Sequence, residues 1–452
     1  MRKRKISKKF LFIKIILLII IIILILLITF KKDNILKNGI ININGKKNKV
    51  LDIIVNKIDI NDENINITFN KDVKCSLDEK TFKSSEEKIC SFSYDENIGK
   101  IYVKDKDKKN KTLDLTDYIS FYKKTKDNYI YVALGATENI SYLYKNLDMK
   151  VVKSSVDSVI SVSEDGLIKG ENLGESTITI KSKEFSVDMK VLVTSLISVK
   201  GLDFNYDKSY LSCGLYTKED NDLLDKILES RVNRGGYGTR AGAVEAARFL
   251  TMEFPYRINY FSENGRMADW PKVDGEGRFY HKGLYLHESR FDVLNQDLIM
   301  NGPNPWGCPI YSNPSKGNRS NGLDCSGFIT WALYNGGFDP SDMGAGIDPY
   351  NDLTDLGEKE RIPDVINSLK VGDLLSGDGE VSGAYYGGHI AMLIGIKDGY
   401  YYVAEELWGR PSLSHGAVAM KYSLDDFIYY FYWRVNMDSY YGSDGNISDY
   451  WY

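Results

Sequence analysis

The spacing of apolar residues changes near residue 215, and this change separates two parts of the chain that must fold differently. Before it, short segments alternate between apolar and polar residues, as strands with one buried face do. After it, from about residue 220 to 254, apolar residues recur at the period of a helix. Because 452 residues suffice for several domains, the sequence predicts a multidomain protein with two all-β domains first and an α+β domain last.

An apolar segment at residues 11–30 follows a basic segment at residues 1–10. About 20 helical residues match the hydrocarbon thickness of a bilayer, and no small-residue cleavage site follows them. The segment is therefore predicted to be an uncleaved transmembrane signal anchor; a buried helix of a soluble domain is disfavoured because it has no polar face. Since the basic cluster precedes it, residues 1–10 are expected in the cytoplasm and the later domains outside, as in a single-pass protein of the cell membrane.

Two β domains are expected after a polar stem at residues 31–49. Residues 50–117 contain short alternating segments between charged turns, which predicts an Ig-like β domain. Residues 118–198 contain strand-like segments separated by Gly-containing turns, such as the one at residues 164–166. Their order resembles the bacterial Ig-like group 2 domain, which implies a spacer or adhesive module. An unrelated β sandwich would have the same mechanical role.

Because the chain is expected to be exported, two disulfides are predicted among its five cysteines. Cys75 and Cys90 lie close together in one β-rich region, and Cys213 and Cys308 could bridge the start of the last domain to a long loop. This pairing leaves Cys325 with a free thiol, which a nucleophile requires. The alternative is that all five cysteines are reduced.

A connection at residues 199–214 leads to the last domain, residues 215–452, which begins with two predicted helices. The first covers residues 220–232, and the second covers residues 240–254 after the capping residue Thr239. Three strands are expected near the end of the chain, at residues 389–396, 400–406 and 426–435.

Cys325 opens an apolar segment with helical spacing, and Asp324 before it is a suitable N-cap. The positive end of a helix favours a thiolate over a thiol, so this position suits a nucleophile. His389 opens the apolar strand-like run about 64 residues later. A cysteine that opens a helix and a histidine that opens a strand indicate a thiol–imidazole pair. A buried cysteine with only a packing role is the simpler alternative.

Three motifs of the last domain occur in an order that resembles the NlpC family of papain-like cell-wall endopeptidases. They are Asp324-Cys325-Ser326-Gly327, Gly372-Asp373-Leu374 and Gly388-His389-Ile390. The resemblance implies a papain-like fold for the last domain, with Cys325 as the nucleophile and His389 as its base. It also implies a polar residue on the next strand that orients the imidazole. Glu405 is the expected residue, and Glu406 is the alternative, on the opposite face of the strand.

The resemblance also implies residues that stabilise the oxyanion and bind the substrate. Tyr256, in the Phe254-Pro255-Tyr256 segment, matches a family tyrosine whose hydroxyl helps to stabilise the oxyanion, and Tyr260 is the alternative. The backbone N–H of Cys325 is the second expected oxyanion donor. Asp324 and Ser326 are expected to contact the free amine end of a stem peptide. The family has a short segment between the tyrosine and the cysteine, whereas this chain has an insertion at residues 257–320.

Composition argues against several other functions. A net charge of −4 gives no reason to expect nucleic-acid binding. No metal site and no cofactor are expected, because the other histidines have no ligand grouping around them; these are His281, His287 and His415. The aromatic residues 429–433 could stack on sugars, but a half-buried closing strand is the preferred interpretation.

Together these features predict a membrane-anchored extracytoplasmic cysteine endopeptidase that hydrolyses peptidoglycan stem peptides. Its expected partners are those peptides and, through residues 11–30, the cytoplasmic membrane. An amidase or acyltransferase with the same Cys–His pair remains an alternative. A non-catalytic cell-surface binding or adhesion protein is the alternative outside the enzymes.

Overall fold

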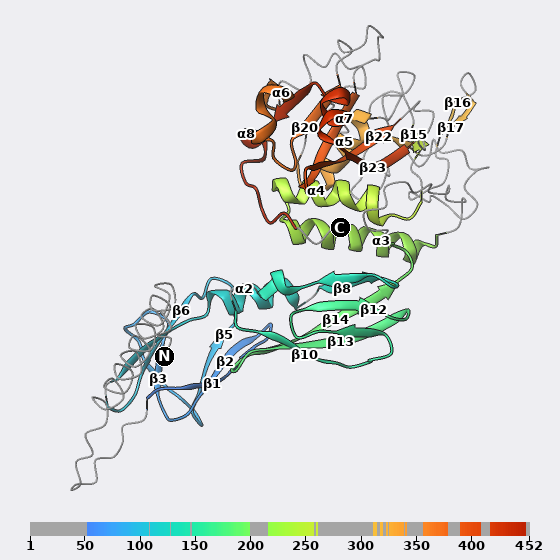
Figure 1. Ribbon diagram of the computed structural model, residues 1–452. Helices are drawn as coiled ribbons and strands as arrows, with labels where there is room; N and C mark the ends of the chain where they lie inside the picture. Colours follow the sequence, from blue (N-terminus) through green and yellow to red (C-terminus); the bar gives the residue numbers. More distant parts are fainter. Residues whose placement is uncertain are drawn as a thin grey trace, which may run out of the picture. The chain divides into compact units, whose positions relative to one another are not determined.

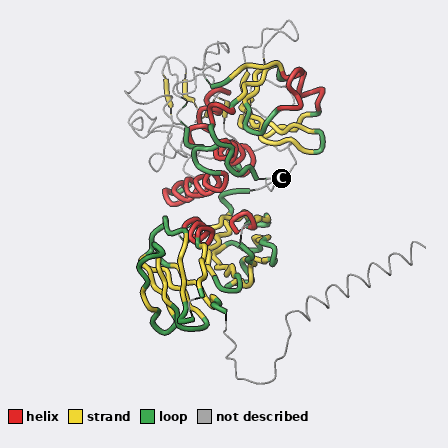
Figure 2. Tube along the Cα trace, turned by 90° about the vertical axis from the view of Figure 1, so that its left-hand side faces the viewer, coloured by secondary structure: helices red, strands yellow, loops and turns green. Residues whose placement is uncertain are grey.

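Strands predominate in the computed structural model, as the yellow segments in Figure 2 show. The predicted basic segment, membrane anchor and stem lie outside the described residues, and so does the predicted connection at residues 199–214. The described residues are 52–107, 109–126, 128–144, 147–198, 216–256, 259–260, 311–313, 317–319, 322–323, 325–338, 340, 356–377, 389–407 and 416–448.

The first β region consists of a three-stranded sheet and a four-stranded sheet. Ile65, Ile67 and Phe69 are buried at alternate positions of one strand, which is the predicted β pattern. A disulfide between Cys75 and Cys90 joins the two sheets and confirms that predicted pair. The strands are β1 (Val55–Ile60), β2 (Asn64–Phe69), β3 (Lys74–Ser76), β4 (Lys83–Ser84), β5 (Ile89–Ser93), β6 (Lys100–Lys104) and β7 (Asn110–Asp114).

The second β region also contains two sheets, with the strand orders β10-β13-β14-β8 and β11-β12-β9. Gly166 has a φ of +91°, and a Cβ there would lie 2.4 Å from the Tyr144 hydroxyl, so this turn requires glycine. The elements are β8 (Tyr129–Ala133), β9 (Thr137–Asn139), the 3₁₀ helix η1 (Ser141–Tyr144), β10 (Lys150–Ser154), β11 (Ile160–Val162), β12 (Leu167–Gly170), β13 (Gly174–Lys181) and β14 (Ser186–Thr194).

The predicted fold class was wrong in two respects. It included a membrane-spanning helix, whereas no helix within the described residues is long and apolar enough to cross a membrane. Residues 11–30, where the sequence placed that helix, lie outside the described residues. It also made both N-terminal domains all-β, whereas helix α2 (Thr116–Thr125) lies between the two β regions. Phe121 of this helix is buried against Phe185 and Tyr144 of the second β region, which explains why the segment is helical here.

Two helices open the last domain, as the sequence predicts. Helix α3 (Lys218–Gly235) begins with a capping box made by Thr217 and Asp220. Helix α4 (Arg240–Arg248) begins after Thr239, whose side chain accepts a hydrogen bond from the backbone N–H of Gly242. A π-helical turn, η2 (Phe249–Glu253), continues α4, and Figure 1 shows α4 lying between α3 and the strands of the sheet.

The largest sheet among the described residues of this domain has six strands in the order β19-β24-β20-β21-β22-β23, and every neighbouring pair in it is antiparallel. Within the same described residues, four helices and one 3₁₀ turn accompany the sheet. The elements are α5 (Cys325–Asn335), β19 (Glu358–Arg361), α6 (Ile362–Val365), η5 (Ile366–Ser368), β20 (Leu374–Gly377), β21 (His389–Lys397), β22 (Tyr400–Leu407), β23 (Gly416–Tyr422), α7 (Leu424–Tyr430), β24 (Trp433–Asn436) and α8 (Asp438–Tyr441).

Both faces of this sheet are covered. Ile390, Met392 and other alternate residues of β21 join the core formed with α4 and α5. Ala391 and Leu393 point the other way, into a smaller core with Phe431 and helix α7. Because the two faces of one strand are committed to different cores, its register is fixed.

The predicted strand at residues 426–435 was wrong for its first half. Residues up to Tyr430 belong to helix α7, and only the last part lies in strand β24. The side chain of Ser423 accepts a hydrogen bond from the N–H of Asp426, with a second acidic residue, Asp425, in the first helical turn. This N-cap favours a helix over the strand that the aromatic pattern suggested.

A buried network of charges joins the second β region to the helix pair. Glu138 of β9 lies 2.5 Å from a guanidinium nitrogen of Arg234 on α3. Arg231 donates to the carbonyl oxygen of Tyr131 and pairs with Glu253 at 3.0 Å. Because these arginines are almost fully buried, each needs its acidic partner to offset the cost of desolvation.

Candidate active site

Cys325 is the first residue of helix α5 and carries a free thiol. The helix is apolar on nearly all sides, with Phe328, Ile329 and Trp331 fully buried, so it runs through the core and fixes its first residue in place. The residue is 6% exposed, and it lies at the positive end of the helix dipole. Asp324, the predicted cap and substrate contact, lies outside the described residues.

His389 is the first residue of strand β21, in register with Gly377 of β20. Its ring stacks on Phe431, with ring centroids 6.3 Å apart and an interplanar angle of 28°. The side chain is 24% exposed, so one part of the imidazole stays accessible to solvent or to a substrate. The strand end and the phenylalanine together restrict the ring to a narrow range of orientations.

Glu405 lies on strand β22 and is fully buried. Its register partner is Ala391, two residues beyond His389, so the glutamate and the histidine are diagonal neighbours on one face of the sheet. Glu405 Oε2 lies 2.7 Å from His389 Nε2. Glu406 is also buried, but its side chain points to the opposite face because strand side chains alternate.

The pKa of His389 is raised from 6.5 to about 9. Burial is the largest single influence and lowers this pKa, because it disfavours the charged ring. Hydrogen bonds to Cys325 and Glu405, together with the charges of these two groups, outweigh burial. Since Nε2 is directed at Glu405, Nδ1 is the nitrogen left for Cys325. This arrangement favours the protonated imidazole, because only that form has an N–H on both ring nitrogens, one for each partner.

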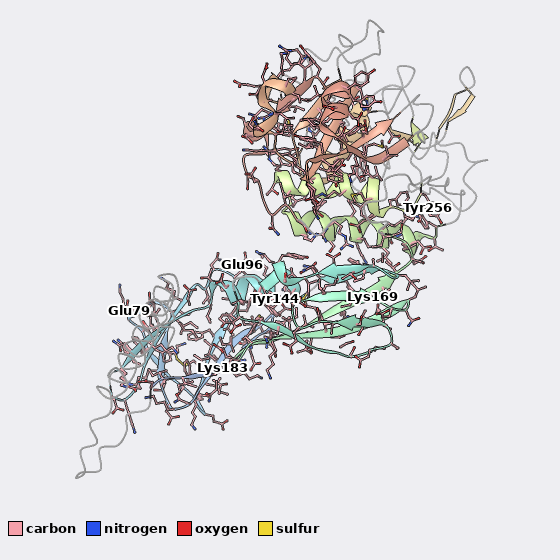
Figure 3. The ribbon with its side chains drawn as sticks, viewed as in Figure 1. Glu79, Glu96, Tyr144, Lys169, Lys183 and Tyr256 are labelled. Atoms are coloured by element: carbon pink, nitrogen blue, oxygen red, sulfur yellow. A yellow bond between two sulfur atoms is a disulfide. The ribbon has the colours of Figure 1, made fainter. Side chains whose placement is uncertain are left out.

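Two tyrosines are predicted to stabilise the oxyanion. The structure describes ring contacts for the first, Tyr256, and the strand position of the second, Tyr260. Tyr256 lies just beyond η2, among the residues labelled in Figure 3. Its described ring contacts are with Tyr216 and Phe254, and it packs against the core that contains Cys325. Tyr260 is in the short strand β15 (Asn259–Tyr260). The choice between the two hydroxyls stays a prediction.

The insertion begins and ends beside the cysteine. Strand β15 pairs in parallel with β18 (Gly322–Leu323), and Tyr260 is in register with Leu323, two residues before Cys325. The chain therefore leaves this point and returns to it, which makes the insertion a loop with adjacent ends. Within it, the structure describes the hairpin of β16 (Tyr311–Asn313) and β17 (Gly317–Arg319).

Ser326 follows the cysteine in α5 and is buried. Its carbonyl oxygen accepts a hydrogen bond from the Thr330 hydroxyl at 2.9 Å, one helical turn later. The predicted contact of Ser326 with a substrate amine stays a prediction.

The Gly372-Asp373 motif lies outside the immediate site and has a structural role. Asp373 is fully buried and pairs with Arg240 of α4 at 3.0 Å and with Arg434 of β24 at 3.3 Å. Gly372 has a φ of +95°, and a Cβ there would lie 2.6 Å from Cγ of Arg240. The motif therefore ties the first helices to the sheet, and glycine is needed because the arginine passes so close.

Sequence reasoning missed two aromatic residues around the imidazole. Tyr422, at the end of β23, donates a hydrogen bond from its hydroxyl to Glu405 Oε1. Phe431 stacks on His389 and also meets the Tyr422 ring edge-on. The continuous apolar run at residues 417–420 was a signal for a buried strand there, but nothing in it indicated that Tyr422 would reach Glu405.

Among the described residues, no group of histidine, cysteine and carboxylate side chains is arranged to hold a metal ion. The other histidines of the chain lie outside those residues: His281, His287 and His415.

Comparison of the chain with models of known protein families, and with curated proteins, gives no match.

Proposed function

We propose that this chain is a cysteine peptidase that hydrolyses stem peptides of peptidoglycan outside the cytoplasm. One observation carries the proposal: His389 lies between a free cysteine at a helix N-terminus and a buried carboxylate. A thiol, an imidazole and an orienting acid are the groups required to form and to hydrolyse a thioester. The substrate class comes from the resemblance of the three motifs to the NlpC family.

In the first half of the proposed reaction, the thiolate of Cys325 attacks the carbonyl carbon of a peptide bond. The tetrahedral oxyanion would be stabilised by the backbone N–H of Cys325 and by the hydroxyl of Tyr256 or Tyr260. The imidazolium of His389 then gives its proton to the departing amine as the C–N bond breaks. This leaves the N-terminal part of the substrate bound to Sγ as a thioester.

In the second half, the neutral imidazole takes a proton from water, and the resulting hydroxide attacks the thioester carbonyl. The C–S bond breaks, the thiolate is restored and the product leaves with a new carboxyl group. Glu405 accepts the second imidazole N–H throughout, so the ring keeps one orientation in both halves. Asp324 and Ser326 are proposed to hold the free amine end of the stem peptide.

The proposed site of action is supported by the disulfide between Cys75 and Cys90. Such bonds persist in oxidising compartments and are rare in the cytosol. Peptidoglycan lies outside the cytoplasm, so the compartment agrees with the proposed substrate.

The test is to incubate the purified full-length protein with bacterial sacculi and to identify the released fragments by mass spectrometry. The proposal predicts soluble peptides cut within the stem, next to a D-configured residue such as γ-D-glutamyl. Cys325→Ala, with the same thermal unfolding midpoint as the wild type, should release none. Equal release by the variant would refute the nucleophile.

The same spectra separate the alternatives. Cleavage of the bond between the lactyl group and the first alanine would identify an amidase, and transfer to an added amine would identify an acyltransferase. Binding to sacculi without any released product would favour a non-catalytic surface protein.

A further inference from the structure

The orienting glutamate has a partner on each of its two oxygens. Glu405 Oε2 faces His389, and Oε1 accepts the hydroxyl hydrogen of Tyr422. Tyr422 comes from β23, on the far side of β22 from the histidine, and its side chain is buried. The carboxylate is thus held from both neighbouring strands of the sheet.

A buried carboxylate is stable in its ionised form only when donors replace the water that it has lost. Glu405 is fully buried, and its hydrogen bond to His389 satisfies one oxygen. The Tyr422 hydroxyl supplies a donor to the other oxygen. Hydrogen bonds to a charged acceptor are roughly twice as strong as those between neutral groups, so the loss of this donor has a measurable cost.

The position of the Tyr422 ring is itself fixed by neighbouring aromatic side chains. Phe431 meets it edge-on with centroids 5.5 Å apart, and Tyr430 lies 5.6 Å away in a tilted arrangement. Phe431 also stacks on His389. Phe431 therefore contacts both His389 and Tyr422. Because Glu405 is hydrogen-bonded to the same two residues, these four side chains form a closed ring of contacts.

We infer that Tyr422 is a positioning residue, whose hydroxyl keeps Glu405 directed at His389. This inference rests on the proposed role of Cys325 and His389. It assigns to β23 a part in the site that the three sequence motifs do not include. Tyr422 acts through the glutamate.

The groups that bear on Glu405 come from several elements. His389 faces it from β21 and Tyr422 from β23, and Cys325 lies beyond the imidazole at the start of α5. On helix α7, Tyr430 packs against the Tyr422 ring. Glu406 follows it on the same strand and points to the opposite face.

The predicted consequence concerns the acid limb of the pH profile of Cys325 reactivity. Without the tyrosine hydroxyl, Glu405 loses the contact that directs it at His389, so it stabilises the imidazolium less. A less stable imidazolium in turn stabilises the Cys325 thiolate less, and the thiolate forms at a higher pH. Tyr422→Phe should therefore move the acid limb upward by about one pH unit.

The measurement is the rate of alkylation of Cys325 by iodoacetamide as a function of pH, followed on the Cys325 peptide by mass spectrometry. Tyr441→Phe is the matched control, because Tyr441 is also buried and its hydroxyl donates to the carbonyl oxygen of Gly372 at 3.0 Å. The control should lose stability without moving the limb. An acid limb in Tyr422→Phe that coincides with that of the control would overturn the inference.

A second substitution covers the case in which Tyr422→Phe does not fold. Replacement of Tyr422 by 3-fluorotyrosine keeps the ring and its packing but makes the hydroxyl a stronger donor, so the acid limb should move downward. An unchanged limb would again overturn the inference. In Glu405→Gln, neither change at position 422 should move the limb further, because no negative charge remains at position 405 to stabilise the imidazolium.

This experiment separates the inference from the proposed function, because alkylation needs no substrate. If the limb moves as predicted but sacculi release no peptide, the role of Tyr422 stands and the peptidase proposal fails. If sacculi release peptides and the limb does not move, only the role of Tyr422 fails.

Discussion

Glu405 and His389 occupy diagonal positions on neighbouring strands, and Glu405 Oε2 lies 2.7 Å from His389 Nε2. Because both residues belong to regular strands, the sheet itself sets the distance between the acid and the base. The contact occupies Nε2 and leaves Nδ1 for Cys325. The backbone geometry thus selects the imidazole nitrogen that exchanges protons with the sulfur.

Glu405 and Glu406 provide the first prediction, because they are adjacent, buried and on opposite faces of one strand. Glu405→Ala should lower kcat/KM for stem-peptide hydrolysis on the order of 10²-fold, since the imidazole loses its orienting acceptor. Glu406→Ala should lower it much less, once rates are corrected for the folded fraction measured by circular dichroism. Equal losses from the two variants would remove the basis for choosing Glu405.

The raised pKa of His389 predicts the base limb of the pH profile. Its value of about 9 means that the imidazolium persists to that pH, and activity that needs it should fall as pH rises through about 9. The charged ring also stabilises the folded state. This stabilisation is complete below pH 6.5, the ordinary pKa of histidine, and it is lost as the pH rises to about 9.

The base limb also tests what raises that pKa. In Glu405→Ala the limb should move down toward 6.5, because a hydrogen bond and a negative charge that raise the pKa are removed. The pH dependence of kcat/KM measures it, with Tyr441→Phe as a buried control away from the imidazole. A limb that stays near 9 in Glu405→Ala would show that the carboxylate does not hold the proton on the ring.

The buried ion pair between Asp373 and Arg240 gives a prediction about stability. Asp373→Asn should lower the free energy of unfolding by roughly 3–5 kcal/mol, because an arginine is left buried with less charge compensation. Asp444→Asn is the matched control: it removes another partner of the same arginine, but one whose side chain is 68% exposed. It should cost much less.

Urea unfolding of the two variants measures this difference, and activity shows whether the motif acts on chemistry. The kcat of the folded fraction should change little in Asp373→Asn, since the aspartate lies outside the site. A large fall in kcat with unchanged stability would contradict the structural role of the motif.

The Cys75–Cys90 disulfide joins the two sheets of the first β region and closes a loop with a sequence separation of 15. Replacing both cysteines by serine should lower the stability of this region by about 3 kcal/mol. Peptide release should be unaffected, because neither sulfur takes part in the proposed chemistry. Calorimetry measures the loss of stability, and the sacculus assay measures peptide release. Loss of peptide release in a folded variant would contradict a purely structural role for this disulfide.

Local patterns predicted the parts of the site that depend on short stretches of sequence. The helical spacing after Cys325 and the apolar run after His389 place both residues at the start of their elements. The resemblance to the NlpC family favoured Glu405, and strand alternation placed Glu406 on the opposite face. The helix and strand inferences use only residues within a few positions of the one concerned.

Contacts between distant segments could not be predicted in this way. Arg240 and Asp373 are 133 residues apart, and nothing in the local sequence of either indicates its partner. The aromatic residues after Ser423 suggested a strand, but the serine cap and two aspartates make most of that segment a helix. That error also hid Phe431, whose contact with His389 depends on where the helix ends.

The most direct test of the central claim is to look for the thioester on Cys325. Incubation of the protein with a defined stem peptide, quenched in acid within the first turnover and digested, should yield the Cys325 peptide carrying the N-terminal part of the substrate. The mass should increase by that fragment and disappear as hydrolysis completes. Product that accumulates with no such adduct, and that Cys325→Ala forms at the wild-type rate, would contradict the account.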